Sequence, residues 1–255
     1  MPEYYDIAFD FRDLPKECAF LDQMCRSYGQ GSPKSVVELG SGPGYHAIHL
    51  SNFGNVSRSI GLDLSPEMIE YAKRKNASAG GSAKFILGDM RDYSLDEPVD
   101  LAICMMATFH LLLTNEDIIQ HFRCVADNLA DSGLYIIECT HPNDFFSQDS
   151  RTQSEWAFER DGIKVTTKWG SDDDKSDPIT QINHTTVTLI VDRQGKRETH
   201  SFIEPFRMLT YQELKLLVEL SGVFEIVDCF GSVDAKISFN NDKDSWRMVP
   251  VLRRV

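Results

Sequence analysis

Within ten residues the chain passes from a strand-like run to a glycine-rich turn, over Ser35-Val36-Val37-Glu38-Leu39-Gly40-Ser41-Gly42-Pro43-Gly44. The apolar first half indicates a buried strand. The glycines allow the backbone to turn sharply and let a ligand approach without meeting a Cβ atom. Tyr45 stands where the dinucleotide fingerprint G-x-G-x-x-G has its third glycine, which argues against a diphosphate ligand. The stretch predicts a strand–turn–helix binding loop, and a purely structural turn is the alternative.

From residue 35 to about residue 140, short apolar runs alternate with amphipathic segments, a pattern typical of βαβ units and a parallel sheet. We expect strands at 35–39, 59–62, 83–87, 99–105 and 134–138, and a final pair at 223–230 and 246–253. Helices are expected at 14–28, at 45–52 and behind three N-cap residues, Ser65, Thr114 and Thr210. The helix behind Thr114 is expected to include Leu129 and to end at Gly133. The prediction is an α/β fold, a Rossmann-like seven-stranded, mostly parallel sheet with helices on both faces.

Between about residues 155 and 207 the pattern changes to antiparallel strands. Asp161-Gly162 separates two strand-like runs, 156–160 and 163–169, and is a strong hairpin signal. Further strands are expected at 179–191 and 197–208. We therefore divide the chain into an N-terminal arm and helix (1–34), a Rossmann-like core (35–150 and 208–255) and an antiparallel β-rich lid insertion (151–207) that covers a substrate.

The composition favours a globular protein with few anionic partners. Of 255 residues, 42% are apolar and 25% are charged, which supplies a core and excludes wholesale disorder. The 26 basic and 39 acidic residues give a formal net charge of −13, and such a surface repels nucleic-acid phosphates and anionic lipid. The apolar runs are shorter than the roughly 20 residues that span a bilayer. The six cysteines are widely spaced and the first residues lack a secretory signal, so we expect a cytoplasmic protein with free thiols.

Three predicted strands, the first, second and third of the sheet, carry an acidic residue at or just after their carboxyl ends: Glu38, Asp63 and Asp89. The carboxyl ends of parallel strands meet at one edge of an open α/β sheet, where such sheets bind ligands. Asp63 follows Gly44 by 19 residues, near the roughly 20 expected for an acid that binds the two hydroxyls of a ribose. The alternative for Asp63 is a loop acid beside a helix N-terminus. The set predicts a ligand site along this edge.

Three motifs, E-x-G-x-G-x-G from Glu38, G-x-D-x-S-x-x-M from Gly61 and G-D-M from Gly88, together resemble those of the class I S-adenosylmethionine-dependent methyltransferases. The type resembled is the small-molecule one, with a methyltransferase domain of the 25/11 kind, and the resemblance covers about residues 36–140. It implies S-adenosylmethionine as cofactor and S-adenosylhomocysteine as product. An acidic cradle suits this cofactor because it is a cation without phosphates.

The resemblance also implies a role for each motif. Glu38 and the glycine turn would hold the methionine portion, and Asp63 would bind the ribose hydroxyls. Asp89 would accept a hydrogen bond from the adenine amino group. The remaining implied contacts of the cofactor with the core are Gly40, Ser41, Gly42, Gly44, Leu64, Met68, Met90 and Met105.

The leader, residues 4–13, looks like the N-terminal segment that folds across the cofactor in small-molecule members of this family. There Tyr5 would contact the cofactor, and Arg12 would pair with its carboxylate. A surface arm with a solvated arginine is the alternative.

Candidate catalytic residues follow the fourth and fifth strands. His110 and His141 are the candidates for a base that removes a proton from the methyl acceptor. A packed, hydrogen-bonded histidine and a loop-capping histidine are the respective alternatives. His46 and His49 are interpreted as helix-surface residues. Weaker lid candidates are His184, Arg207, Trp156 and Trp169. No spacing names a metal, and none is expected.

The resulting hypothesis is a methyltransferase that acts on nitrogen or oxygen of a small molecule, as a monomer or homodimer, without nucleic-acid or membrane partners. One alternative keeps the fold and cofactor with other chemistry on the sulfonium. A non-catalytic binding or scaffold protein is another. A nicotinamide dehydrogenase is disfavoured by Tyr45.

Overall fold

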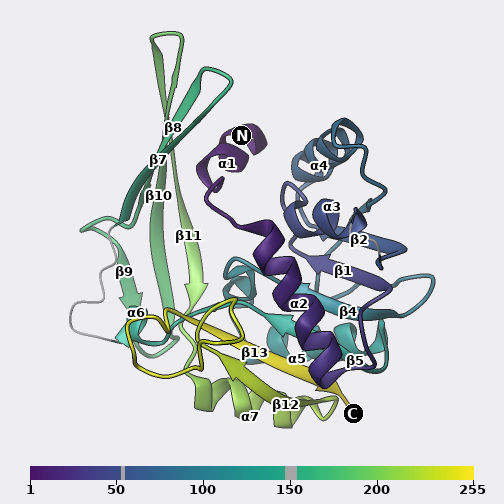
Figure 1. Cartoon of the computed structure of the whole chain (residues 1–255). Coiled ribbons are helices and arrows are strands. Elements are labelled where there is room, and N and C mark those ends of the chain that lie inside the picture. The colour runs from purple at the N-terminus through teal and green to yellow at the C-terminus, as the bar shows by residue number, and fades with distance from the viewer. Residues whose placement is uncertain (53–54, 147–153) are drawn as a thin grey trace. The chain divides into compact units, whose positions relative to one another are not determined.

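The computed structural model describes residues 1–52, 55–146 and 154–255, which form two compact units (Figure 1). The parallel unit comprises Asp13–His141 and Thr210–Val255. The antiparallel unit comprises Met1–Arg12 and Pro142–Leu209. The boundary predicted at residues 150 and 151 lies outside the described residues.

The sheet of the parallel unit has eight strands: seven lie in the order β12-β13-β5-β4-β1-β2-β3, and the short strand β6 pairs with β13. Strands β1 to β5 run parallel where they pair, whereas β13 is antiparallel to both β5 and β12. The strand bounds are β1 (Ser35–Leu39), β2 (Arg58–Asp63), β3 (Lys84–Leu87), β4 (Val99–Cys104), β5 (Leu129–Ile137), β6 (Cys139–Thr140), β12 (Phe224–Phe230) and β13 (Arg247–Arg254). The predicted mostly parallel α/β sheet is confirmed.

Three helices of the parallel unit start at the predicted caps. The side chains of Ser65, Thr114 and Thr210 each accept a hydrogen bond from the backbone N–H three residues later, at 3.0–3.3 Å. This removes an unpaired donor from each helix start. The helices are α2 (Leu14–Tyr28), α3 (Tyr45–Ser51), α4 (Pro66–Ser78), α5 (Asn115–Asp127) and α7 (Tyr211–Ser221), with a short 3₁₀ helix η1 (Thr108–Leu111).

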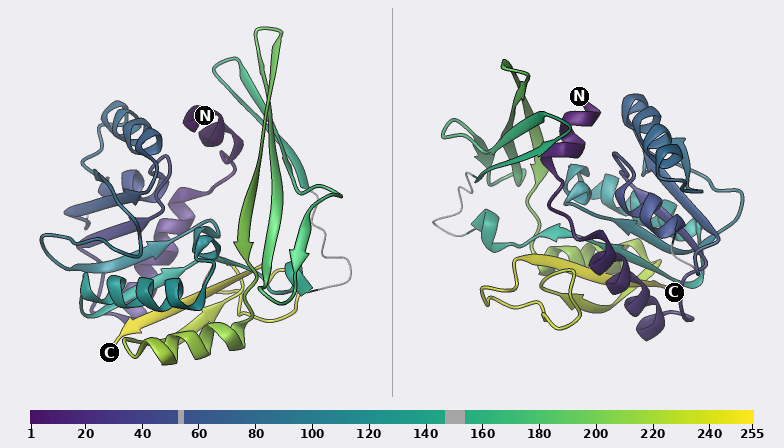
Figure 2. Two further views of the ribbon diagram at one scale, coloured as in Figure 1. Left: turned by 180° about the vertical axis from the view of Figure 1, so that it is seen from behind. Right: turned by 45° about the horizontal axis from the view of Figure 1, so that its top comes forward.

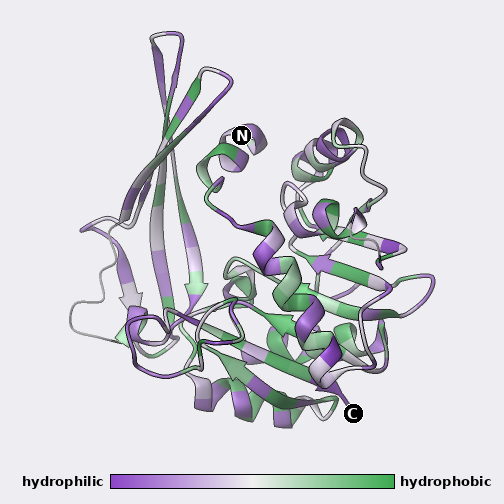
Figure 3. Ribbon diagram, viewed as in Figure 1, coloured by the Kyte–Doolittle hydropathy of each residue, from purple (hydrophilic) through white to green (hydrophobic). Residues whose placement is uncertain are grey.

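Both faces of the sheet are covered, as the alternation of its side chains shows. Val36, Leu101 and Ile136 face a cluster that includes Leu21 of α2. On the opposite face, Tyr135 of β5 packs against Phe122 of α5, with ring centroids 6.4 Å apart. Apolar residues accordingly run through the central strands (Figure 3). Burial on both faces explains why these strands have continuous apolar sequences.

Helix α5 ends earlier than predicted. It stops at Asp127, and β5 begins at Leu129. Asn128 causes the change: its side-chain amide donates to the carbonyls of Cys124 and Tyr93, and its Oδ1 accepts from the Leu95 N–H at 2.7 Å. A side chain that satisfies backbone groups ends a helix where apolar periodicity alone would continue it.

The antiparallel unit is a sheet in the order β11-β10-β8-β7, with β9 pairing β10 (Figure 2). The predicted hairpin is confirmed: Asp161 and Gly162 have φ of 53° and 74°, as a two-residue hairpin with a matching twist requires. Gln194 and Gly195, at 53° and 76°, make the second tight turn. The elements are α1 (Pro2–Ala8), α6 (Asn143–Phe146), β7 (Ser154–Arg160), β8 (Ile163–Trp169), β9 (Lys175–Asp177), β10 (Ile182–Arg193) and β11 (Lys196–Arg207).

Residues 1–34, predicted as an N-terminal arm and helix, divide between the two units. Helix α1 belongs to the antiparallel unit, whereas α2 belongs to the parallel unit. The indole N–H of Trp156 donates to the carbonyl of Ala8 at 2.6 Å, and Arg160 pairs with the buried Asp6. The ring of Phe9 lies 5.8 Å from that of Trp156. These contacts join the leader to the strands of its own unit.

None of the helices among the described residues is long and apolar enough to cross a membrane.

Candidate functional site

The glycine turn and Asp63 form one hydrogen-bonded structure at the carboxyl ends of β1 and β2. The Gly42 N–H donates to Asp63 Oδ2 at 2.7 Å, and the Ser65 N–H donates to Oδ1 at 2.8 Å. The Ser41 N–H also donates to the carbonyl of Leu62 at 2.9 Å. Asp63 is therefore held by backbone groups on both sides and cannot swing away from the turn.

Burial raises the pKa of Asp63 above its usual value, and the nearby Glu38 raises it further, although the N–H groups of Ser65 and Gly42 oppose both effects. A carboxylate in this position is short of solvent and can accept further hydrogen bonds. Next to it, the apolar side chain of Leu64 is 70% exposed. An exposed leucine beside a partly buried acid suits a ligand with an apolar ring and a polar sugar.

The glycines adopt backbone angles that other residues avoid. Gly40, Gly42 and Gly44 have φ of 64°, 50° and 79°. A Cβ atom on Gly40 would lie 2.3 Å from the methyl group of Thr108 in η1, and one on Gly44 would lie 2.6 Å from the ring of Phe85. The turn is thus tightly enclosed by η1 and β3, and only glycine fits.

Glu38 is buried, and both of its carboxylate oxygens serve the start of α3. Oε1 lies 2.9 Å from Nδ1 of His46, and Oε2 accepts from the Ala47 N–H at 2.8 Å. His46 is 1% exposed, so its interpretation as a helix-surface residue is wrong. Its other ring nitrogen lies 2.8 Å from Oε2 of Glu17 in α2. The predicted contact of Glu38 with the methionine portion stays a prediction.

Asp89 lies two residues after the last residue of β3. The preceding Gly88 N–H donates to the carbonyl of Asp63 at 3.0 Å and so joins this segment to β2. Both oxygens of Asp89 accept hydrogen bonds from the guanidinium of Arg91, which also donates to Asp117 of α5 at 2.6 Å. These bonds lower the pKa of Asp89, which is therefore ionised at neutral pH. The sequence interpretation missed Arg91, although its place two residues after Asp89 was a usable signal.

The histidines named as candidate bases both hold strand-end loops. His110 is fully buried, and its Nε2 accepts the Thr140 N–H at 2.9 Å, so that lone pair is already used. Nε2 of His141 lies 2.9 Å from the carbonyl of Asn240 and therefore donates to it. This geometry favours positioning roles, and proton transfer by either residue stays a prediction.

Glu138, at the end of β5, is a buried carboxylate that the sequence interpretation missed. Its Oε2 accepts the Met106 N–H at 2.9 Å, and its Oε1 accepts from Arg247 at 3.1 Å. Met106 and Ala107 have φ of 56° and 60°, which costs about 1 kcal/mol or more per residue. Glu138 offsets this strain in the loop that carries η1.

Replacing Glu138 by glutamine should lower the free energy of unfolding by about 2 kcal/mol, because an amide cannot accept at both ends and leaves a buried donor unpaired. Denaturant unfolding measures the change. E225Q is the control, since Glu225 of β12 also pairs with an arginine of β13, Arg253, but is 48% exposed, and it should change stability by under about 0.5 kcal/mol. Equal losses in both variants would contradict the assignment.

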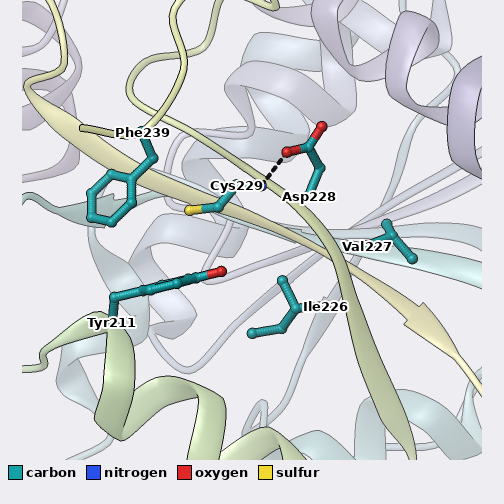
Figure 4. Close-up of a pocket in the computed structure, with 6 residues that line it drawn as sticks. All are labelled: Tyr211, Ile226, Val227, Asp228, Cys229 and Phe239. Carbon is teal, nitrogen blue, oxygen red and sulfur yellow. Dashed lines mark hydrogen bonds between the residues drawn. The ribbon is translucent and has the colours of Figure 1, made fainter.

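A separate hollow of about 350 Å³ lies at the edge strand β12 (Figure 4). The hydroxyl of Tyr28 donates to Asp228, and burial raises the pKa of the Cys229 thiol to about 12. The hollow therefore presents a paired carboxylate and a protonated thiol, and no predicted site residue lines it. The lining residues are Tyr211, Ile226, Val227, Asp228, Cys229 and Phe239.

The remaining predicted residues differ in burial and in the unit to which they belong. Met68 and Met90 are partly buried, and Met105 is 3% exposed. Tyr5 and Arg12 belong to the antiparallel unit, so their contact with a cofactor stays a prediction. Among the described residues, no group of three His, Cys, Asp or Glu side chains is placed to hold a metal ion.

Known proteins resemble this chain in sequence and in fold. Residues 36–133 match the family described as "Methyltransferase domain". Trans-aconitate 2-methyltransferase from Streptomyces coelicolor is 31% identical over 130 residues, which are 50% of this chain and 41% of that protein. The dTDP-4-amino-2,3,4,6-tetradeoxy-D-glucose N,N-dimethyltransferase from Saccharopolyspora spinosa is 31% identical over 128 residues, 50% of this chain and 48% of the relative. The chain thus spans less than half the length of these two relatives.

The structural similarity covers more of the chain than the sequence similarity does. The crystal structure of an S-adenosylmethionine-dependent methyltransferase from Clostridium acetobutylicum superposes with a TM-score of 0.78 at 16% identity, and the match covers 98% of this chain and 96% of that one. The sequence match coincides with the strands that carry the glycine turn, Asp63 and Asp89. Residues 36–133 thus match a methyltransferase domain in sequence, and the fold of the whole chain is that of a solved S-adenosylmethionine-dependent methyltransferase.

Proposed function

We propose that the chain binds S-adenosylmethionine at the carboxyl ends of β1, β2 and β3 and transfers its methyl group to nitrogen or oxygen of a small molecule. The observation that carries the proposal is the bond from the Gly42 N–H to Asp63, which joins the glycine turn and the ribose-type acid into one site. The family match over the same strands supports it.

The residues present fit this cofactor. Ser41 Oγ, inside the turn, is buried without a hydrogen-bond partner among the described residues, so it is available to a ligand. The turn carries no side chain at positions 40, 42 and 44, and this lets it pack closely against Thr108 and Phe85. Two carboxylates, Asp63 and Glu38, lie close enough to influence each other, and they complement a cation.

In this arrangement each group of the chain has a positional task. Asp63 accepts hydrogen bonds from the ribose hydroxyls, Leu64 and Met68 pack on the adenine ring, and the turn with Glu38 holds the methionine portion. Asp89 accepts a hydrogen bond from the adenine amino group, and Met90 lies beside the ring. The cofactor, when bound, supplies a methyl group already activated by its sulfonium. The chain has to align the acceptor, exclude water and accept a proton where the acceptor carries one.

The acceptor class follows from the relatives. One relative is named for trans-aconitate and the other for an amino-sugar nucleotide, so both names point to small molecules. The net charge of −13 disfavours nucleic acid as a substrate. All six cysteines are free thiols, in keeping with a cytoplasmic location. We propose a monomer or homodimer in which the antiparallel unit covers the acceptor.

Calorimetric titration with S-adenosylhomocysteine tests the cofactor assignment. Wild type should bind at tens of micromolar or tighter, and Asp63→Ala should weaken binding at least about tenfold, because a charge-assisted acceptor is lost. Glu67→Ala, an exposed acid on α4, is the control and should bind as wild type does. No binding by wild type, or equal binding by Asp63→Ala, would defeat the proposal.

The same titration has a predicted pH dependence. The ionised form of Asp63 accepts the hydroxyls, and its pKa is raised. Affinity should therefore fall on acidification at a higher pH than an ordinary aspartate would give. Methyl transfer itself is tested with a methyl-labelled cofactor and a panel of amino sugars and carboxylic acids, with label in the acceptor as the expected product.

A further inference from the structure

A buried cluster of three ionisable side chains lies beneath the glycine turn. His46 of α3 is 1% exposed, and it stands between Glu38 of β1 and Glu17 of α2, which are 4% and 9% exposed. The ring nitrogens lie 2.9 Å and 2.8 Å from oxygens of these two carboxylates. Three elements of the parallel unit thus meet at a single imidazole.

The geometry fixes the number of protons. A neutral imidazole has one N–H, yet both ring nitrogens face carboxylate oxygens, and a carboxylate only accepts. Both hydrogen bonds require one extra proton, which imidazole, the stronger base, carries.

The cluster controls both ends of the turn. Glu38 stands before Gly40, and its second oxygen accepts from the Ala47 N–H beyond Gly44. The orientation of this one carboxylate therefore sets how the chain leaves β1 and enters α3. Glu38 also acts on Asp63, whose pKa it raises. Glu17 and His46 fix Glu38, and Glu38 affects the two parts of the proposed cofactor site.

We propose that His46 is a positioning residue of the cofactor site, an imidazolium held between Glu17 and Glu38 that fixes the Glu38 carboxylate beneath the turn. This inference rests on the proposed function. It assigns His46 no contact with the cofactor or the reacting atoms.

The charge is tested on the wild-type chain without ligand. Long-range ¹H–¹⁵N spectra distinguish an imidazolium from either neutral tautomer, and the His46 signal is identified through its neighbour Ala47. At pH 8 we expect both nitrogens of His46 to be protonated. In Glu17→Gln, the ring should become neutral, with the proton on the nitrogen that faces Glu38. A neutral wild-type ring at pH 8 overturns the charge assignment.

The positioning role is tested by two substitutions that place an amide differently. In His46→Asn the amide nitrogen takes the place of Nδ1 and still donates to Glu38, whereas in His46→Gln it takes the place of Nε2 and faces Glu17. We expect H46Q to weaken binding of S-adenosylhomocysteine at least about tenfold, and H46N to stay within about threefold of wild type. His49→Gln, on the same helix and partly exposed, is the control.

A role in packing alone predicts the reverse order, because asparagine is smaller and leaves the larger cavity. Equal loss in both variants, or binding by H46Q within about twofold of wild type, overturns the proposal. Circular dichroism checks that each variant folds. If H46Q does not fold, H46N and Glu17→Gln still test the proposal, because both keep the donor to Glu38 and must bind S-adenosylhomocysteine. If wild type does not bind, the proposed function fails, whereas the spectra still report on the His46 charge.

Discussion

Alanine at Gly40 should weaken binding of S-adenosylhomocysteine at least about a hundredfold, the largest effect we expect from a single methyl group. Gly40 has φ of 64°, and its added Cβ would lie 2.3 Å from the methyl group of Thr108. The left-handed backbone costs an alanine about 1 kcal/mol, and the clash forces either the turn or η1 to move. Because the Ser41 and Gly42 N–H groups bond to β2, a moved turn also loses Asp63. Calorimetry measures the affinity.

Two variants separate the clash from the backbone strain. Gly80 has a similar φ of 65° with no atom within 4 Å of an added Cβ, so Gly80→Ala carries the strain alone and should bind normally. Adding Thr108→Ser to Gly40→Ala removes the clashing methyl group and should restore most of the lost affinity. If Gly40→Ala binds like wild type, or Thr108→Ser restores nothing, the enclosed turn is not the binding loop.

Acidification should destabilise the chain through His121 by about 3 kcal/mol between pH 7 and pH 4. His121 is fully buried; its Nδ1 lies 2.8 Å from the Met90 carbonyl and its Nε2 2.6 Å from the Tyr135 hydroxyl. Burial lowers its pKa to about 4, although the hydrogen bond to the Met90 carbonyl and the negative charge of Asp89 act to raise it. The folded chain therefore takes up this proton later than the unfolded chain, and stability present above pH 6.5 is lost as the pH falls towards 4.

Denaturant unfolding at several pH values measures this loss. His121→Gln removes the titrating group, so its free energy of unfolding should depend less on pH than that of wild type over this range, whatever its stability at pH 7. His184→Gln, at an exposed position of β10, is the control and should keep the wild-type dependence. A pH dependence in His121→Gln as steep as in wild type would refute the assignment.

Local sequence signals account for most of what could be predicted. The glycine turn, the N-caps and Asp161-Gly162 each depend on residues within four positions, and each is confirmed. The three acids fall at one sheet edge because parallel connectivity fixes where strands end. The backbone N–H groups of Gly88 and Ser41 also bond to carbonyls of β2 at this edge. Such bonds do not depend on the type of side chain.

What failed depends on contacts distant in sequence. The sequence around His46 is typical of a helix surface, because nothing in it identifies Glu17, 29 residues earlier, as the partner of His46. One signal was available: Glu17 lies on the same stripe of α2 as the buried Leu21 and Met24, and a buried glutamate needs a partner. The assignment of α1 to the antiparallel unit depends on Trp156 and Arg160, 148 and 154 residues away from their partners.

A crystal structure of the chain with S-adenosylhomocysteine tests the central claim most directly. We expect the ligand against the turn of residues 40–44, with both ribose hydroxyls within hydrogen-bond distance of the Asp63 carboxylate and the adenine beside Leu64. A ligand bound elsewhere, or one in that cleft whose ribose makes no contact with Asp63, would contradict the account.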